Sequence, residues 1–413
     1  MERLEIKGKI ATAIAYAKVI EDEAVEQIRR MCDYEITEGS RIRIMPDVHW
    51  GKGCTIGTTM TVTDKVVPNL VGVDIGCGMY TVNLGKKEID LAKVDEAAHI
   101  IPSGRQLWEG RQAKFDFTEL RCYRDLKNIK RIAKALGTLG GGNHFIEIDR
   151  AADGTNYLVI HTGSRSLGTQ VAEIYQSLAI DLAHGKAALF EARDEMIRRY
   201  KAEGRRAELQ EAIKELHRNF RPTKMTVPPD LAFLFGKYLD DYLHDIAICQ
   251  RFAELNREKI AEVMLAHLGI APSEAFHTVH NYIDTEERIL RKGAIAAHKG
   301  ERVLIPINMR DGSILAVGRG DPEWNYSGPH GAGRLMSRTT ARERFTLEEF
   351  QKEMAGVYTT SIGEGTLDEA PMAYKSLADI VDVICDSVDV VEVLKPIYNF
   401  KAGGPKGAIE EME

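Results

Sequence analysis

The stretch Val71-Gly72-Val73-Asp74-Ile75-Gly76-Cys77-Gly78-Met79 places a carboxylate and a thiol three residues apart among glycines. The apolar, β-branched run Val66–Val73, bent at Pro68, predicts a strand that ends at this turn. Glycine removes packing surface and lets the backbone approach a ligand. A thiolate and a carboxylate are both metal ligands, so Asp74 and Cys77 are candidates for a metal site. A tight turn with a small buried cysteine explains this stretch equally well when it is taken alone.

Three mid-chain histidines also lie beside glycine or short polar residues. Asn143 precedes His144, Thr162 follows His161, and Asn281 follows His280. Aspartate, cysteine and histidine together suit Mn, Fe, Co or Zn better than Ca or Mg. The sequence therefore favours a transition-metal site, and the structural alternative is a set of flexible turns. The candidate ligands are Asp74, Cys77, His144, His161 and His280.

A further histidine, His330, lies in Ser327-Gly328-Pro329-His330-Gly331-Ala332-Gly333-Arg334. Imidazole can attack phosphorus and form a phosphoramidate. Arg334 and Arg338 could neutralise a phosphoryl group in transfer, and Arg165, which follows His161 by four residues, indicates a phosphate pocket beside the metal. The competing role for His330 is a sixth metal ligand. These residues indicate a metal-dependent enzyme that acts on phosphates, without defining its substrate.

The candidate ligands are spread from residue 74 to residue 280, which argues for one large α+β domain of mixed sheets with flanking helices. We expect each ligand at a strand end or a glycine turn, where sites usually lie. Residues 1–401 form this expected domain, with a helical insertion at about 169–268, and residues 402–413 form a loose tail. The apolar patterns predict strands and helices along the whole chain. Strands are expected within 40–82, 146–148, 157–160 and 275–318, and helices at 88–100, 126–136, 347–356 and 375–394.

Composition limits the class of protein. The chain has 413 residues, 44% of them hydrophobic, and a net charge of −7, so a globally basic surface for nucleic acid is absent. A local basic channel remains compatible with this balance. The basic segment 193–206 is best interpreted as a solvated helical hairpin, with contact to RNA phosphates as the alternative. The six cysteines form no CxxC pair, and no apolar run approaches the length of a membrane helix, so we expect a soluble cytoplasmic protein without a membrane partner.

Seven stretches resemble the RtcB-type RNA-splicing ligases, in the family's order, from about residue 40 to residue 401. The matching stretches are Met45–His49, Val73–Met79, Gly142–Glu147, His161–Arg165, His280–Tyr282, Arg291–Ala294 and His330–Arg334. The resemblance implies a GTP- and manganese-dependent ligase with an α+β fold. Such enzymes join an RNA 3′-phosphate, or a 2′,3′-cyclic phosphate opened to it, to a 5′-hydroxyl end.

The resemblance also implies roles for individual residues. His330 matches the guanylylated nucleophile, the five candidate ligands match a site for two Mn²⁺ ions with Cys77 bridging them, and Lys401 matches a lysine that holds the guanine base. Further guanine-nucleotide contacts are implied at Asn143, Phe145, Glu147, Asn281, Gly331, Ala332 and Gly333. The implied partners are GTP and RNA with broken ends, such as tRNA halves or damaged RNA. An activating helper protein is a further candidate partner.

The chain departs from the family pattern near the nucleotide. Many members have Pro-Gly-Ser-Met-Gly where Pro306-Ile307-Asn308-Met309-Arg310-Asp311-Gly312-Ser313 stands here, so we expect Asn308, Met309 and Ser313 to supply the local contacts. Ser166 replaces a common glycine, and the tail past Lys401 could partly cover the nucleotide pocket. These departures indicate a divergent subgroup with a repair role. They also motivate two alternatives, a metal-dependent cyclic-phosphate phosphodiesterase that has lost ligation and, against the intact ligand set, a non-catalytic RNA-end binder.

Overall fold

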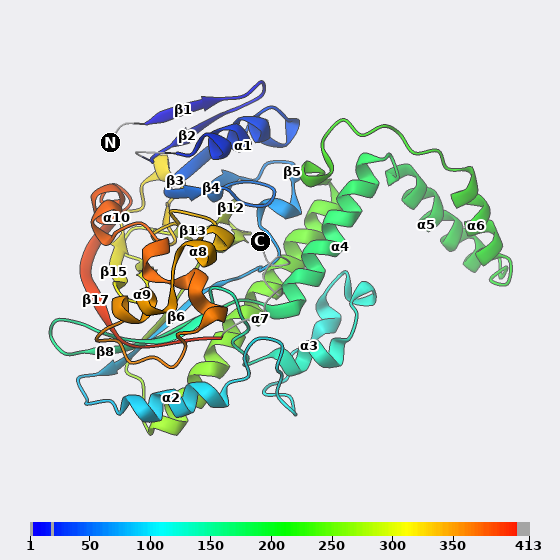
Figure 1. Ribbon diagram of the computed structural model, residues 1–413. Coiled ribbons are helices and arrows are strands. Elements are labelled where there is room, and N and C mark those ends of the chain that lie inside the picture. Colours follow the sequence, from blue (N-terminus) through cyan, green and yellow to red (C-terminus); the bar gives the residue numbers. More distant parts are fainter. Residues whose placement is uncertain (1–2, 18–19, 403–413) are drawn as a thin grey trace.

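The computed structural model describes residues 3–17 and 20–402, and it confirms a mixed α+β fold with several sheets (Figure 1). The N-terminal sheet has six strands in the order β1-β2-β3-β4-β12-β11. Its strands β2 and β3 are parallel, and its other neighbours are antiparallel. The bounds are β1 Leu4–Lys7, β2 Thr12–Ala15, β3 Ile42–His49, β4 Ile56–Thr61, β12 Ile289–Lys292 and β11 Asn281–Asp284. Helix α1 (Asp22–Cys32) packs on β1 and β2 through Ile28 and Met31.

The second large sheet has seven antiparallel strands in the order β10-β6-β8-β7-β17-β15-β14. Its central strands are rich in buried β-branched residues, which favour a pleated, buried surface. The predicted strands at 146–148 and 157–160 are confirmed as parts of β7 and β8. The bounds are β10 Ala275–Val279, β6 Gly78–Gly85, β8 Asn156–Thr162, β7 Phe145–Arg150, β17 Val388–Lys401, β15 Gly312–Gly318 and β14 Arg302–Asn308.

Helix α7 (Lys237–Leu268) is the long helix that packs on β6 and β8, with α2 (Leu91–Ile100) and α4 (Arg165–Ala183) beside it. Its buried residues include Phe252 and Ile260, which belong to two different hydrophobic clusters. Helix α3 (Ile129–Ala135) packs against α4. Helices α5 (Ala187–Ala202) and α6 (Leu209–Asn219) project from the body as a hairpin (Figure 1).

The remaining elements are short and surround the two sheets. Two small sheets pair β13 with β16 and β5 with β9. Their bounds are Ala294–Ala296, Ser327–Pro329, Lys65–Val66 and Leu234–Phe235. The last helices are α8 Arg338–Arg344, α9 Leu347–Glu353 and α10 Leu377–Ile384. Single 3-10 turns lie at Glu35–Thr37, Pro68–Leu70, Phe117–Glu119, Tyr123–Asp125, Pro229–Leu231, Pro322–Trp324, Glu364–Glu369 and Pro371–Ala373.

Two local predictions were wrong. The run Val66–Val73 is not a strand, because Pro68 starts a 3-10 turn and Gly72 has a φ of 91°, so the following strand begins only at Gly78. Residues 375–394 are not one helix either. The helix ends at Ile384, and the β-branched residues from Val388 onward pair with β15 and β7 as strand β17.

None of the helices within residues 3–17 and 20–402 is long and apolar enough to span a membrane. Apart from Ala402, the predicted tail lies outside the described residues. The single-domain organisation and the boundaries of the helical insertion stay predictions.

Candidate active site

Strand register brings the predicted metal ligands to one end of the seven-stranded sheet. His161 near the end of β8 lies opposite both Met79 of β6 and Phe145 of β7. Cys77 directly precedes β6, and His144 directly precedes β7. We predicted from the sequence that the candidate ligands lie at strand ends and turns. The structure places these residues there.

His280 reaches the same end from a neighbouring strand. It follows β10, whose last residue Val279 pairs with Gly78, and its backbone N–H donates to the carbonyl of Cys77 at 2.9 Å. The next residue, Asn281, begins β11 of the other sheet. The site thus lies where the chain crosses from one large sheet to the other.

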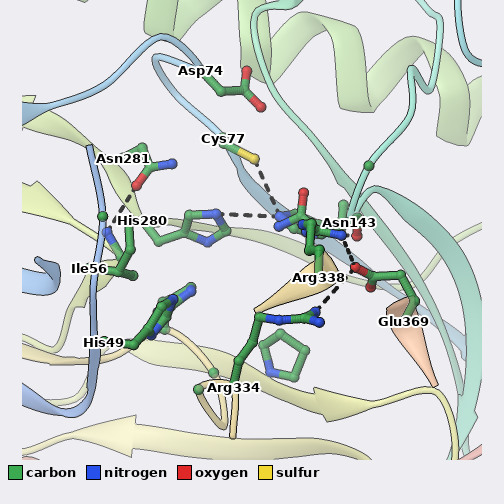
Figure 2. Close-up of a pocket in the computed structure, with 18 of the residues that line it drawn as sticks. His49, Ile56, Asp74, Cys77, Asn143, His280, Asn281, Arg334, Arg338 and Glu369 are labelled. Carbon is green, nitrogen blue, oxygen red and sulfur yellow. Dashed lines mark hydrogen bonds and ion pairs between the residues drawn. The ribbon is translucent and has the colours of Figure 1, made fainter. Parts of the chain in front are cut away.

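The side chains form a compact cluster around the Cys77 sulfur. Its Sγ lies 3.5 Å from Nε2 of His144 and 3.3 Å from Nε2 of His161. The Nε2 atoms of His161 and His280 are 3.3 Å apart, and Nε2 of His144 is 3.0 Å from a carboxylate oxygen of Asp74. Cys77 and His280 point into the cavity on one side (Figure 2).

The protonation of these groups fits a bound cation. Nδ1 of His161 is 3.2 Å from the Asn143 carbonyl, so this ring donates there and presents a bare Nε2 to the sulfur. His144 has an acceptor on each side, with Nδ1 3.0 Å from the Leu139 carbonyl and Nε2 3.0 Å from Asp74. Burial and then neighbouring imidazoles hold the pKa of His161 and His280 well below the usual range, which keeps these rings neutral. A metal ion would bind Nε2 of His161 and the Cys77 sulfur together.

The ligands divide into two groups that share one residue. Cys77, His161 and His280 can each offer a ligand atom within 4.8 Å of the others, and so can Asp74, Cys77 and His144. Burial opposes the charge of Asp74, but hydrogen bonding to His144 outweighs it and lowers the pKa of Asp74 to about 2. Cys77 belongs to both groups, and the donor types suit a transition metal.

Buried polar residues of α7 hold the ligand loops in place. Nη1 of Arg257 donates to the carbonyls of Gly76 at 2.7 Å and Thr162 at 2.9 Å, which ties the Asp74–Cys77 turn to the end of β8. Asn256 donates to the carbonyls of Thr138 and Gly163, both at 3.1 Å. These side chains are completely buried, so they fix the geometry of the loops from behind.

Arg165 lines the same cavity with a buried guanidinium. Its backbone has a φ of 56°, and its guanidinium packs so closely on Gly140 that a Cβ there would lie 2.1 Å from Nη2. Its Nε has no hydrogen-bond partner within the described residues. A buried cation with a spare donor is suited to an anion, in line with the predicted phosphate pocket.

His330 is held by a carboxylate that sequence reasoning did not single out. Nδ1 of His330 is 2.7 Å from Oδ2 of Asp47, a completely buried residue of β3, and the backbone N–H of His330 donates to the same oxygen at 3.2 Å. Gly333 has a φ of 74°, and a Cβ there would lie 2.8 Å from the Asp47 carbonyl oxygen, so the glycine lets the histidine loop approach β3. The arrangement leaves Nε2 of His330 as the ring nitrogen that does not contact Asp47.

One cavity of about 560 Å³ connects these groups. It is lined by all of the predicted site residues except His144 and Ser313, which are completely buried. The lining residues are Asp74, Cys77, His161, His280, His330, Asn143, Phe145, Glu147, Asn281, Asn308, Met309, Gly331, Ala332, Gly333, Lys401, Arg165, Arg334 and Arg338. The structure therefore gathers nearly all of the predicted site around one space.

At one end of the cavity, which we call the inner end, charged residues form a cluster centred on Glu369. This buried carboxylate accepts hydrogen bonds from Lys401 and Arg338 and lies 3.6 Å from Nη1 of Arg334 (Figure 2). Tyr374 also donates to it at 2.8 Å. Although burial disfavours its charge, Lys401 and the arginines hold the pKa of Glu369 well below its usual range. Arg334 and Arg338 are thus fixed at the cavity wall by a carboxylate that no sequence pattern had marked.

Two further acidic residues, Glu147 and Asp149, belong to strand β7 at the same cavity. Glu147 lines the cavity, accepts a hydrogen bond from the Asn399 amide at 2.5 Å, and belongs to the same strand as the fully buried Asp149. Neither carboxylate oxygen of Asp149 has a hydrogen-bond partner in the described part of the chain. Burial raises the pKa of both residues, so the pair holds protons at pH values where ordinary carboxyls are ionised.

The divergent segment 306–313 forms the hairpin between β14 and β15. The Asn308 side chain is used within this turn: its amide donates to Asp311 at 2.8 Å, and its oxygen accepts from the backbone N–H groups of Arg310 and Asp311. Arg310 is paired with Asp311 and Glu353. Ser313 is completely buried in β15. The residues of this segment that line the cavity are Pro306, Ile307, Asn308 and Met309.

Three buried imidazoles around a thiol, with a fourth histidine beside them, form a candidate metal site. Comparison with known proteins then identifies the family. The family described as "tRNA-splicing ligase RtcB" matches residues 27–124 and 110–402. The chain belongs to the RtcB family.

Individual relatives agree along most of their length. RNA-splicing ligase RtcB of Escherichia coli (strain K12) is 32% identical over 403 residues, which cover 87% of this chain and 90% of the relative. RNA-splicing ligase RtcB2 of another E. coli strain, ATCC 25922, is 26% identical and covers 94% of both chains. The tRNA-splicing ligase RtcB of Aeropyrum pernix is 28% identical and covers 82% of this chain and 83% of the relative.

Proposed function

We propose that this protein is an RNA ligase that joins RNA 3′-phosphate or 2′,3′-cyclic phosphate ends to 5′-hydroxyl ends, in RNA repair or tRNA splicing. The reaction uses GTP and two Mn²⁺ ions and passes through a guanylylated His330. The observation that carries the proposal is the Asp47–His330 pair, with Nδ1 and Oδ2 2.7 Å apart, in the cavity that also contains the Cys77 cluster. The related proteins are named RNA-splicing and tRNA-splicing ligases, which supports the substrate class.

In the first step, Nε2 of His330 attacks the α-phosphorus of GTP. An N–P bond forms, the bond to the β-phosphate oxygen breaks, and pyrophosphate leaves. Because Nδ1 keeps its proton, the ring becomes positively charged as the bond forms, and the Asp47 carboxylate stabilises that charge. The neutral state of His330 before attack is the nucleophilic one.

The next steps transfer the guanylyl group and then release it. An oxygen of the RNA 3′-phosphate attacks the phosphorus, the N–P bond breaks, and a P–O–P linkage forms. The 5′-hydroxyl then attacks the RNA phosphate, loses its proton, and GMP leaves. A 2′,3′-cyclic end must first be opened by water to the 3′-phosphate.

Asp74, Cys77, His144, His161 and His280 would hold the two ions, which supply charge neutralisation at the phosphates. Arg165 also lines the cavity, and its guanidinium would add positive charge near the phosphates. Arg334 and Arg338 share their charge with Asp368 and Glu369, so we assign them a positioning role along the phosphate path.

The nucleotide base fits the inner end of the cavity. Phe145 offers an aromatic face, and Nζ of Lys401 lies 5.5 Å from the centre of that ring. Glu147 and Lys401 together supply an acceptor and a donor for a purine edge. The ribose and phosphates would lie in the rest of the cavity, which is lined by Asn143, Asn281 and the Gly331–Gly333 loop.

A metal-dependent phosphodiesterase that opens 2′,3′-cyclic ends without ligation is the second candidate. The observation that favours it is the turn at 306–313, where the Asn308 side chain is used within its own turn and Ser313 is buried away from the cavity. Weaker contacts between this segment and GTP would impair guanylylation but would not affect the hydrolysis of a cyclic phosphate.

Label transfer from GTP separates the two candidates. Purified protein is incubated with Mn²⁺ and GTP labelled at the α-phosphate, and the protein is tested for acid-labile, alkali-stable label, as expected for a phosphoramidate. His330→Ala should carry no label, and His217→Ala, which changes an exposed histidine of α6, should be labelled like the wild type. Label on His330→Ala would show that another residue is the nucleophile. Absence of label on the wild type, with hydrolysis of a cyclic end, would favour the phosphodiesterase.

A further inference from the structure

The cavity is also lined by a half-exposed tryptophan that none of the steps above uses. Trp50 directly follows His49 at the end of β3, lines the cavity, and is 52% exposed. The other two tryptophans have partners: Trp324 is buried and stacked on Tyr16, and Trp108 donates to the carbonyl of Gly137. Single exposed apolar residues are common on protein surfaces, so exposure by itself indicates nothing.

The loop that carries Trp50 is held rigidly. The Gln27 side chain of α1 donates to the Gly51 carbonyl at 2.5 Å and accepts from the Gly51 N–H at 3.4 Å. The buried Lys292 donates to the carbonyls of Lys52 and Asn69. Gly53 has a φ of 84° and packs against Asn69 so closely that a Cβ would lie 2.8 Å from the Asn69 carbonyl oxygen. A clamped loop that displays an indole at a cavity mouth has the features of a preformed stacking surface.

The indole ring favours a base over a phosphate, because it carries no charge. The exposed charged residues Lys52, Arg105, Glu21 and Glu23 line the same cavity and include both signs. The flat face of an indole binds nucleobases of any sequence, since every base has a π-face.

We propose that Trp50 is the stacking platform for the unpaired nucleobase at the RNA end that enters the cavity. This inference rests on the proposed function, because it needs an RNA substrate. Trp50 and His330 line the same cavity, so a base on the indole would lie in the space that also contains the proposed nucleophile. Stacking of this kind tolerates all bases and requires that the terminal nucleotide is not paired.

The test measures RNA binding with and without the terminal base. A single-stranded RNA with a 3′-phosphate is labelled at its far end, and its Kd is measured by fluorescence anisotropy beside that of the same RNA with an abasic terminal nucleotide. The wild type should bind the complete RNA about tenfold more tightly, within the range of about 5- to 150-fold for one stacked base. Trp50→Leu should lose this preference, and Trp50→Phe should keep most of it.

Phe235→Leu is the matched control, because Phe235 is an aromatic residue 39% exposed outside the cavity. It should bind both RNAs like the wild type. Melting temperature and metal content show whether Trp50→Leu is folded. A wild type without preference, or a Trp50→Leu variant with the full preference, would overturn the inference while label transfer to His330 stands. Absence of both RNA binding and label transfer would instead overturn the proposed function, and this inference with it.

Discussion

Oδ2 of Asp47 accepts hydrogen bonds from both Nδ1 and the backbone N–H of His330, 283 residues further along the chain. The carboxylate lies in the interior of the six-stranded sheet and is completely buried. Its contacts therefore fix the ring orientation and the tautomer of His330 at once. In the proposed reaction Nε2 is the nitrogen that meets the substrate.

The first prediction concerns this pair. Asp47→Asn should keep the side-chain shape but lose the negative charge that balances the ring after attack, so the rate of label transfer from GTP should fall by about 10²- to 10⁴-fold. The KM for GTP and the metal content should change little, because Asp47 touches neither nucleotide nor ligand cluster in the proposed arrangement. Label transfer at the wild-type rate would show that the pair has no role in the reaction.

The second prediction follows from the two ligand groups that share Cys77. Cys77→Ala should lower the affinity for both ions, by more than the ~10–100-fold typical of losing an outer-shell partner. His280→Ala and Asp74→Asn should each release mainly one ion. Metal content per chain, measured by mass spectrometry after desalting, distinguishes these outcomes. Cys249→Ala, a buried cysteine of α7 outside the cluster, is the control and should bind metal normally. Equal loss in the Cys77 and His280 variants would contradict a shared ligand.

The candidate metal ligands could be predicted from the sequence because their local setting is distinctive. Histidine, cysteine and aspartate beside glycine stand out in a short stretch of chain, and the family motifs fix their order. The distances could not be predicted, since they depend on the register of four strands. His144, His161 and His280 become neighbours only because β7, β8, β6 and β10 lie side by side.

Asp47 and Glu369 show what local patterns miss. Asp47 lies in a strand with the family motif Met45–His49, but only the fold brings it to His330. Glu369 ends a 3-10 turn, and nothing near it in the sequence indicates that Lys401, Arg338 and Arg334 converge on it. The wrongly predicted helix at 375–394 has a similar cause, because the pairing of β17 with β15 and β7 is a long-range choice.

The third prediction uses a glycine packed against a ligand. A Cβ at Gly163 would lie 2.0 Å from Oδ1 of Asp74, so Gly163→Ala must displace that carboxylate. We expect loss of the ion held by the Asp74 group and slower label transfer. Gly141→Ala is a matched control in a neighbouring cavity loop, because its Cβ would meet no heavy atom closer than 3.9 Å. Full metal content in Gly163→Ala would show that Asp74 is not needed as a ligand.

The fourth prediction concerns the buried carboxyl of Asp149 and the pH dependence of stability. Burial raises its pKa to about 7 from the ordinary value of 3.8. Between these two pH values the folded protein holds a proton that the unfolded chain has lost. The stability contributed by this group therefore falls as pH rises from about 4 to about 7, by up to about 1.4 kcal/mol for each pH unit, and stays low above pH 7.

Asp149→Asn removes the ionisable group, so the variant should gain stability over the wild type at pH 8 and should not gain at pH 4. The measurement is the free energy of unfolding at several pH values, with metal removed from both proteins. Asp153→Asn serves as the control, because ion pairing with Lys86 lowers the pKa of this exposed carboxyl to about 2 and reverses the sign of its contribution. A constant difference between Asp149→Asn and the wild type across this pH range would mean that Asp149 is ionised in the folded protein.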